Sequence, residues 1–370
     1  MTFDVVVIGA GIAGASVAAE LAGAARVLIL EAESLPGYHA TGRSAAFWSQ
    51  TYGGPLVEPL TTASGPLLAD PPANFADRPF LAPRGELHIA DEGGREALAA
   101  LEREFAGTRV RLEPLDRSEL EALLPGLRAG WTHGLIERSC QDIDVAALHA
   151  AYLRQARQGG AELVVDAAVI GAERRGDSWE IVTPAGTHRA AVAVNAAGAW
   201  ADPVARLFGA RPLGIVPYRR TMVQVRTAPP PPAELPLVMD ARGRFYFRPE
   251  GAARLWLSPH DESPCAPHDC APEELDVAIA VDRFEQAVDW RIERVERSWA
   301  GLRSFAPDRL PVYGFDPAVP GLFWFAGQGG FGIQTAPAAA RLAAALLLGT
   351  APHASVVAID PAPYRPGRFA

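Results

Sequence analysis

The stretch from Val5 to Glu31 constrains the fold more than any other part of the sequence. It begins with an apolar run, VVVI, which predicts a short buried strand of a parallel sheet. Gly9, Gly11 and Gly14 follow in the spacing G-x-G-x-x-G, then an alanine-rich run with helical spacing and a second apolar run, VLIL. Strand, glycine turn, helix, strand and acidic residue in this order predict a βαβ unit that binds a dinucleotide.

Each residue of the motif has a mechanical role. Gly9 permits the tight turn from strand to helix, Gly11 lets a pyrophosphate approach the backbone, and Gly14 lets the helix lie close to the strand. The free N–H groups and positive dipole at the helix start favour phosphate. Glu31 is suited to accept the ribose hydroxyls, and its charge would repel the 2′-phosphate of NADP. The motif alone does not separate NAD from FAD.

Composition excludes several classes of partner. The chain has 370 residues and a formal net charge of −9, which argues against nucleic acid and against a polybasic membrane site. No apolar run is long enough for a transmembrane helix, and the first strand begins too early for a signal peptide, so we expect a cytoplasmic protein. The sequence contains no lysine, which removes Schiff-base chemistry.

The three cysteines are scattered and form no C-x-x-C pair. Cys265, His268 and Cys270 lie close together, but in a proline-rich segment without the usual ligand spacing. We therefore expect free thiols and no metal site.

The order of apolar and alternating segments predicts two interleaved domains. Apolar runs near positions 5, 27, 164, 192 and 323 predict parallel strands, and the last leads into a glycine loop and an Ala/Leu helix. Alternating segments near 85 and over 215–258 predict an antiparallel sheet, and 272–295 carries helical spacing.

This interleaving predicts an α/β fold: a Rossmann-like nucleotide domain assembled from discontinuous segments, with an inserted α+β domain that contains the antiparallel sheet. The predicted boundaries are 1–80, 140–212 and 296–370 for the nucleotide domain, and 81–139 and 213–295 for the substrate domain.

Several motifs across the chain carry a resemblance to a known family. They are GYHATGRSAA from residue 37, NAAGAW from 195, PYRR from 217, FYFRP from 245, WAGLRSF from 299 and QGGFGIQT from 328. In this order they resemble the D-amino acid oxidase/glycine oxidase (DAO) family of FAD-dependent oxidoreductases, and within it they are most similar to bacterial D-arginine dehydrogenase.

The resemblance implies non-covalent FAD, since no cysteine follows Cys270 for attachment. The residues that it places at the cofactor are Gly9, Gly11, Ala13, Gly14, Glu31, Ala32, Thr41, Gly42, Arg43, Ser44, Ala45, Ala46, Val169, Ala197, Gly198, Gly329, Gly330, Phe331, Gly332, Ile333, Gln334 and Thr335.

The substrate site is predicted from charge matching. Arg220 and Arg303 are suited to pair with an amino acid carboxylate, and the Tyr52 and Tyr246 hydroxyls to hydrogen-bond it, so these four are the candidate catalytic residues. The resemblance adds further residues to the substrate-binding set: Phe47, Ser49, Glu86, Leu237 and Gly330.

Two of these positions bear on the side chain of the substrate. The resemblance aligns Glu86 with a carboxylate of the family that contacts a cationic side chain of the substrate. Phe47 and Ser49 stand where D-arginine dehydrogenase has histidine and threonine, which weakens the case for arginine and leaves room for hydrophobic D-amino acids.

The predicted reaction is FAD-dependent oxidative deamination of cationic or hydrophobic D-amino acids. Hydride passes from Cα to flavin N5, and the imine then hydrolyses to a 2-oxo acid and ammonia. Alternatives on the same fold are oxidation of glycine, sarcosine or a 2-hydroxy acid; an alternative of another class is a flavin-binding subunit without turnover. We expect the electron acceptor to be a quinone or another acceptor than oxygen.

Overall fold

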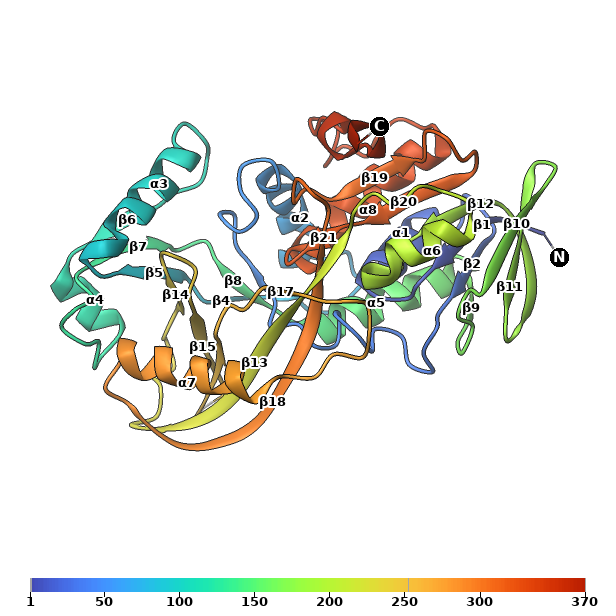
Figure 1. Ribbon diagram of the computed structural model, residues 1–370. Helices are drawn as coiled ribbons and strands as arrows, with labels where there is room; N and C mark the ends of the chain where they lie inside the picture. Colours follow the sequence, from blue (N-terminus) through green and yellow to red (C-terminus); the bar gives the residue numbers. More distant parts are fainter. Residues whose placement is uncertain (1, 252, 370) are drawn as a thin grey trace.

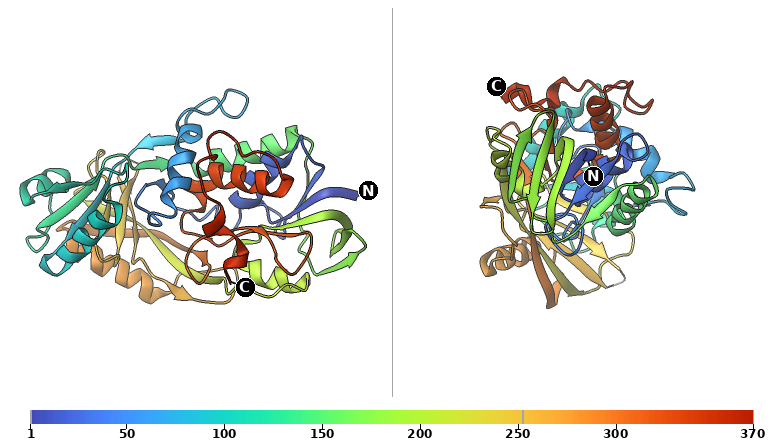
Figure 2. Two further views of the ribbon diagram at one scale, coloured as in Figure 1. Left: turned by 90° about the horizontal axis from the view of Figure 1, so that it is seen from above. Right: turned by 90° about the vertical axis from the view of Figure 1, so that its right-hand side faces the viewer.

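The computed structural model describes residues 2–251 and 253–369, and within these ranges its strands form one eight-stranded, one ten-stranded and one three-stranded sheet. Figure 1 shows the eight-stranded sheet, with the N-terminus, at one end of the molecule and most of the ten-stranded sheet at the other. The view from above in Figure 2 shows the same division. We call these two sheets I and II.

Sheet I has a parallel centre. Its strands are β1 (Thr2–Ile8), β2 (Val27–Leu30), β9 (Glu162–Val164), β10 (Gly171–Arg175), β11 (Ser178–Thr183), β12 (Gly186–Asn195), β19 (Val312–Phe315) and β20 (Leu322–Ala326). The pairs β9–β2, β2–β1, β1–β12 and β12–β20 are all parallel, as the apolar runs predict. The carboxyl ends of these strands therefore meet at one edge, where α/β folds bind their ligands.

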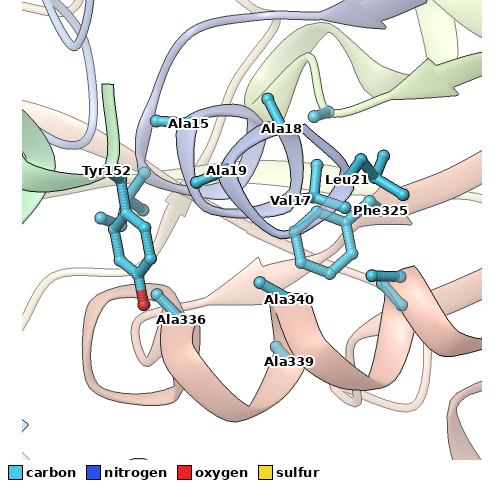
Figure 3. Packing of buried hydrophobic residues seen from close by; sticks show 14 of the residues in the cluster. Ala15, Val17, Ala18, Ala19, Leu21, Tyr152, Phe325, Ala336, Ala339 and Ala340 are labelled. Atoms are coloured by element: carbon cyan, nitrogen blue, oxygen red, sulfur yellow. The ribbon is translucent and has the colours of Figure 1, made fainter. Parts of the chain in front are cut away.

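Helices cover one face of sheet I. They are α1 (Ile12–Leu21), α5 (Val145–Gln158) and α8 (Gly332–Leu348), with α2 (Glu58–Ala69) packed beside α8. Figure 3 shows small side chains of α1, among them Ala15 and Ala19, and of α8, among them Ala336 and Ala340, in one buried cluster with Tyr152 of α5. Small side chains let the two helices approach closely. Because α1 follows β1 and α8 follows β20, both helix N-termini lie toward the carboxyl edge of the sheet.

The other face of sheet I packs on α6 (Ala201–Leu207) and a second apolar cluster. Residues 162–195 thus supply both parallel strands and an antiparallel hairpin, β10–β11, that extends β12. Across the described residues, no helix combines the length and the apolar character needed to cross a membrane.

Sheet II is mixed. Its strands are β5 (Glu86–Ala90), β6 (Glu113–Leu115), β7 (His133–Glu137), β13 (Val216–Ala228), β14 (Leu237–Asp240), β15 (Tyr246–Glu250), β16 (Arg254–Ser258), β17 (Ser263–Pro264), β18 (Arg291–Phe305) and β21 (Gln328–Gly329). Most neighbours are antiparallel, as predicted, and β14 pairs with β5 in parallel.

The faces of sheet II differ in function. One face packs its apolar side chains on α4 (Arg117–Leu123) and α7 (Glu274–Ala287), while α3 (Arg95–Phe105) lies beside β5 and β7. Alternate residues of the same strands, among them Met222 and Tyr246, point to the opposite face, toward the nucleotide part. The third sheet, β3 (Phe47–Trp48), β4 (Leu81–Pro83) and β8 (Gln141–Ile143), contains Phe47, which packs in the same cluster.

Two boundaries predicted from the sequence differ from the structure at the long strand β18 (Arg291–Phe305). The helix predicted over 272–295 ends at Ala287, and β18 begins at Arg291, because residues 291–295 pair with β13. This long-range pairing overrides the local helical spacing. The predicted domain boundary at 296 falls inside β18, which belongs to sheet II along its whole length.

Candidate active site

A cavity of about 380 Å³ opens at the carboxyl edge of sheet I. Its wall comes from the β1–α1 turn, the end of β2, the loop over 37–45, the turn after β12, and the segment 328–333. Strands β13 and β18 of sheet II close its far end with Arg220, Met222 and Arg303. The cavity is therefore shared between the two predicted domains.

The three motif glycines play different roles. Gly9 has a φ of +101°, and a Cβ there would lie 2.6 Å from the Ala196 carbonyl oxygen. A Cβ on Gly14 would lie 1.8 Å from the Gly9 carbonyl oxygen, so this glycine is needed for helix–strand packing. A Cβ on Gly11 would meet only the Thr41 hydroxyl, at 3.2 Å, and would otherwise point into the cavity. Gly11 is thus the position that leaves room for a ligand.

The turn between β1 and α1 is held by hydrogen bonds on both sides. Glu31 is buried at the end of β2, and its carboxylate accepts hydrogen bonds from the Ala10 N–H at 2.6 Å and the Glu33 N–H at 3.0 Å. On the other side, Nε2 of the buried His149 on α5 lies 2.8 Å from the Ala10 carbonyl oxygen. The sequence analysis missed His149, because nothing in the local pattern of α5 distinguishes it from a core residue.

Arg43 lines the cavity, and its guanidinium is held by protein groups. Its guanidinium donates to the Asp269 carboxylate at 2.5 Å and to the carbonyls of Cys270 at 2.8 Å and Ala300 at 3.2 Å. The side chain therefore ties the 37–45 loop to the loop before α7. Thr41 is also engaged, since its hydroxyl accepts a hydrogen bond from Ile12 N–H at the start of α1.

The far end of the cavity holds two arginines and two tyrosines. Arg303 Nη1 donates to the Tyr52 hydroxyl at 2.8 Å, and Arg303 Nη2 lies 3.4 Å from the Tyr246 hydroxyl. Tyr246 in turn donates to Met222 Sδ at 3.0 Å. The structure thus brings the four candidate catalytic residues together.

Arg220 leaves one donor free. The residue is 3% exposed; its Nε donates to the Asp261 carbonyl at 2.7 Å and its Nη2 to the Glu262 carboxylate at 3.1 Å. Its Nη1 is buried and has no hydrogen-bond partner among the described residues. Burial lowers the pKa of Arg220, and the nearby positive charge of Arg303 lowers it further. Two guanidiniums close together with an unpartnered donor form a site for an anion.

Gly330 opens directly onto this site. A Cβ there would lie 1.9 Å from the Tyr52 hydroxyl and 3.2 Å from Arg303 Nη1. Only glycine fits at this position, so the residue sets how closely the 328–332 loop approaches the Tyr52 hydroxyl and the Arg303 guanidinium.

The predicted side-chain pocket is closed. Phe47, Leu237, Met239, Tyr246 and Met222 form one buried cluster, and the cavity wall includes only the last two of them. Met222 is a wall residue that the sequence analysis missed, although its spacing of two from Arg220 on a strand places both on one face.

Glu86 lies on β5, next to Leu237 and opposite Glu137 of β7. Its side chain is 1% exposed, and Glu86 is not among the described residues that line the cavity. Burial, and then the charge of Glu137, raises the pKa of Glu86 to about 8. His88 lies 3.4 Å away, and burial lowers its pKa to about 4. At neutral pH both groups are therefore uncharged in this structure.

Comparison with known proteins identifies the family. A family model described as FAD dependent oxidoreductase (DAO) matches residues 4–346. The chain belongs to the DAO family. Glycine oxidase from Pseudomonas aeruginosa is 30% identical to this DAO-family enzyme over 382 residues, 99% of each chain.

Solved structures share the fold. Glycine oxidase from Geobacillus kaustophilus superimposes with a TM-score of 0.86 at 24% identity, over 98% of each chain. L-α-glycerophosphate oxidase from Mycoplasma pneumoniae, solved with FAD bound, gives a TM-score of 0.84 at 17% identity, over 94% of this chain and 95% of that one. The predicted α/β architecture with a substrate domain is confirmed.

FAD is the cofactor of this DAO-family enzyme, as predicted. The open space at Gly11, the two helix N-termini and the buried Glu31 carboxylate fit a dinucleotide. Of the predicted cofactor residues, those that line the cavity are Gly9, Gly11, Ala13, Glu31, Ala32, Thr41, Arg43, Ser44, Ala45, Val169, Ala197, Gly198, Gly329, Gly330, Gly332 and Ile333. The described wall contains no cysteine, and non-covalent binding stays a prediction.

Other predicted site residues lie behind the wall. Among the cofactor candidates these are Gly14, Gly42, Ala46, Phe331, Gln334 and Thr335, and among the substrate candidates Phe47, Ser49, Tyr52, Glu86 and Leu237. Tyr52 nevertheless reaches the site through Arg303. The Gln334 amide bonds the backbone of Ser49 and Tyr52, and the Thr335 hydroxyl donates to the Phe331 carbonyl at 2.8 Å. These side chains shape the loops around the cavity rather than its surface.

Proposed function

We propose that this DAO-family enzyme oxidises a small α-amino acid, glycine or an N-substituted glycine, to the imine. The observation that carries the proposal is the pair of guanidiniums at the end of the cavity, with Arg220 Nη1 buried and unpartnered. A substrate carboxylate between Arg220 and Arg303 would satisfy this donor and pair with both guanidiniums.

The residues of the chain supply binding and orientation. Arg303 and Arg220 hold the carboxylate, and the Tyr52 hydroxyl, which accepts from Arg303, keeps its own proton to donate to a carboxylate oxygen. When bound, FAD supplies the acceptor for the two electrons and the hydrogen that leave Cα. The amine loses a proton, and the released imine takes up water to give a 2-oxo acid and ammonia from glycine, or a 2-oxo acid and the corresponding primary amine from an N-substituted glycine.

Substrate size is the second element of the proposal. The contact between the Tyr246 hydroxyl and Met222 Sδ, backed by Phe47 and Leu237, leaves no open path to a side-chain pocket. A substrate with no side chain needs none. The likeness to glycine oxidase from Pseudomonas aeruginosa over nearly the whole chain supports the same choice.

The second candidate is a D-amino acid with a cationic side chain, as in D-arginine dehydrogenase. Its support is Glu86, whose Oε2 is buried without a partner in the described residues. A guanidinium that reached it would find an acceptor. This candidate requires Phe47, Leu237 or Met222 to move, and ionisation of Glu86 on binding.

Anaerobic reduction of the bound flavin separates these candidates. Glycine, sarcosine, D-alanine, D-leucine and D-arginine are added in turn, and the loss of flavin absorbance is followed. We expect glycine or sarcosine to reduce the flavin fastest. Faster reduction by D-arginine would favour the second candidate, and no reduction by any amino acid would favour a 2-hydroxy acid substrate or a subunit without turnover.

A further inference from the structure

The turn formed by residues 49–52 is bound to sheet II through one carboxylate. Glu137 is fully buried at the end of β7 and accepts hydrogen bonds from Ser49 Oγ at 3.1 Å, Gln50 N–H at 2.9 Å, and Thr51 N–H at 3.2 Å. The Thr51 hydroxyl donates to it at 2.7 Å, and the Ser139 hydroxyl at 2.9 Å. Five donors around one carboxylate fix the turn against the end of β7.

The same turn is bound on its other side by α8. Gln334 Oε1 accepts from Ser49 N–H at 3.2 Å, and its Nε2 donates to the carbonyls of Ser49 at 3.1 Å and Tyr52 at 3.2 Å. Nε2 also lies 2.8 Å from the Thr61 hydroxyl. The turn is therefore clamped between sheet II and the helix that begins at the cavity.

The end of this turn carries Tyr52, whose hydroxyl has very little freedom. It accepts from Arg303 Nη1 at 2.8 Å and lies 1.9 Å from the position of a Cβ on Gly330. A shift of the turn by a few tenths of an ångström would lengthen the bond to Arg303 or press the ring against the Gly330 backbone. The geometry of the anion site thus depends on where the turn is held.

We propose that Glu137 is a positioning residue for the substrate carboxylate. It acts through the 49–52 turn, which carries Tyr52 at its end. The inference rests on the proposed function, since it gives Tyr52 and Arg303 the carboxylate as their ligand. Glu137 itself lies outside the cavity wall. A glutamine in its place would present an amide NH₂ to backbone N–H and hydroxyl donors, so the turn would have to move.

A merely structural role is the competing explanation, and a double-mutant cycle separates the two. The holoenzyme variants are Glu137→Gln, Tyr52→Phe and the combination of both. The probe is acetate, which has the carboxylate of glycine and no amine, titrated through its effect on the flavin absorbance spectrum. FAD content and melting temperature are measured for each variant.

The matched control is Asp202→Asn. Asp202 is also a buried carboxylate that accepts from three backbone N–H groups, those of Leu213, Gly214 and Ile215, at 2.9 to 3.1 Å. The turn that it holds carries none of the predicted site residues. Asp202→Asn should lower the melting temperature and leave the acetate affinity unchanged.

We expect Glu137→Gln and Tyr52→Phe each to weaken acetate binding by about tenfold, and the double variant to be no weaker than Tyr52→Phe alone. Losses that multiply in the double variant, or an unchanged acetate affinity in Glu137→Gln, would overturn the inference. If Glu137→Gln yields no holoenzyme, Thr51→Val removes the shortest of these bonds; it should weaken acetate about threefold, and an unchanged affinity would again contradict the role.

The cycle can fail independently of the proposed function. If the wild-type enzyme binds acetate and no amino acid reduces its flavin, the proposed function fails and the cycle is still measurable. If glycine reduces the flavin and the losses are additive, only the role of Glu137 fails.

Discussion

Arg303 and Tyr52 are joined by a 2.8 Å hydrogen bond at a point where no side chain at residue 330 fits. The two residues are far apart in sequence and belong to different parts of the molecule: Arg303 lies on β18 of sheet II, and Tyr52 follows the turn between β3 and α2. Gly330 comes from the loop before α8. The turn with Tyr52, strand β18 with Arg303 and the loop with Gly330 therefore have to be correctly placed relative to one another for the anion site to form.

Gly330→Ala should disturb the relative placement of these three segments. Its Cβ would displace the Tyr52 hydroxyl and crowd Arg303, so we expect the KM for the amino acid substrate to rise by about tenfold or more, with FAD still bound. Steady-state kinetics with measured FAD content test this. Gly130→Ala is the control, since a Cβ there meets nothing within 4 Å and should leave KM unaltered.

Arg303 should contribute to substrate affinity through its hydrogen-bond geometry as well as through its charge. Arg303→Ala is expected to raise KM by about a hundredfold or more, because it removes the donor shared by the carboxylate and both tyrosines. Arg303→Lys keeps the charge and loses the planar fork, so it should recover only part of the affinity. Near-normal kinetics in Arg303→Ala would contradict the assignment of the anion site.

The glycines of the first turn should separate ligand binding from folding. Gly11→Ala adds a methyl group that points into the cavity, so the affinity for FAD should fall by about tenfold while the apoprotein keeps its melting temperature. Gly14→Ala would place its Cβ 1.8 Å from the Gly9 carbonyl oxygen and should destabilise the apoprotein itself. Equal losses of stability in the two apoproteins would contradict this division.

Glu86 should give stability an unusual pH dependence. Its pKa is raised from 4.5 to about 8, so between these values the folded state binds more protons than the unfolded state, and stability falls as the pH rises. Glu86→Gln removes this proton uptake. Its melting temperature relative to wild type should increase from pH 5 to pH 9, by several degrees in total. A constant difference across this range would show that Glu86 is ionised throughout.

The sequence predicts the parts of the fold that depend on local pattern. The strand, glycine turn and helix of residues 5–31 follow from periodicity and from the steric needs of glycine, and the parallel strands of sheet I follow from uninterrupted apolar runs. The start of β18 at Arg291 could not be predicted in this way. Its conformation is set by pairing with β13, which is distant in sequence.

The candidate site shows the same limit. Arg303 and Arg220 are predictable, because a charge in an apolar segment must be buried with a partner. The hydrogen bonds of a side chain are not predictable: Gln334 and Arg43 were expected at the cofactor, but the Gln334 amide lies outside the cavity wall, and the Arg43 guanidinium, although it lines the cavity, donates to protein groups. Glu137 has no local signal at all, since its five donors come together only through tertiary structure.

Arg220 and Arg303 are proposed to select the carboxylate of a small amino acid. The most direct test compares the rates of anaerobic flavin reduction by glycine and by glycinamide, which replaces the carboxylate with a neutral amide. We expect glycine to reduce the flavin and glycinamide to do so at least about a hundredfold more slowly at equal concentration. Equal rates, or a flavin that glycine leaves oxidised, would contradict it.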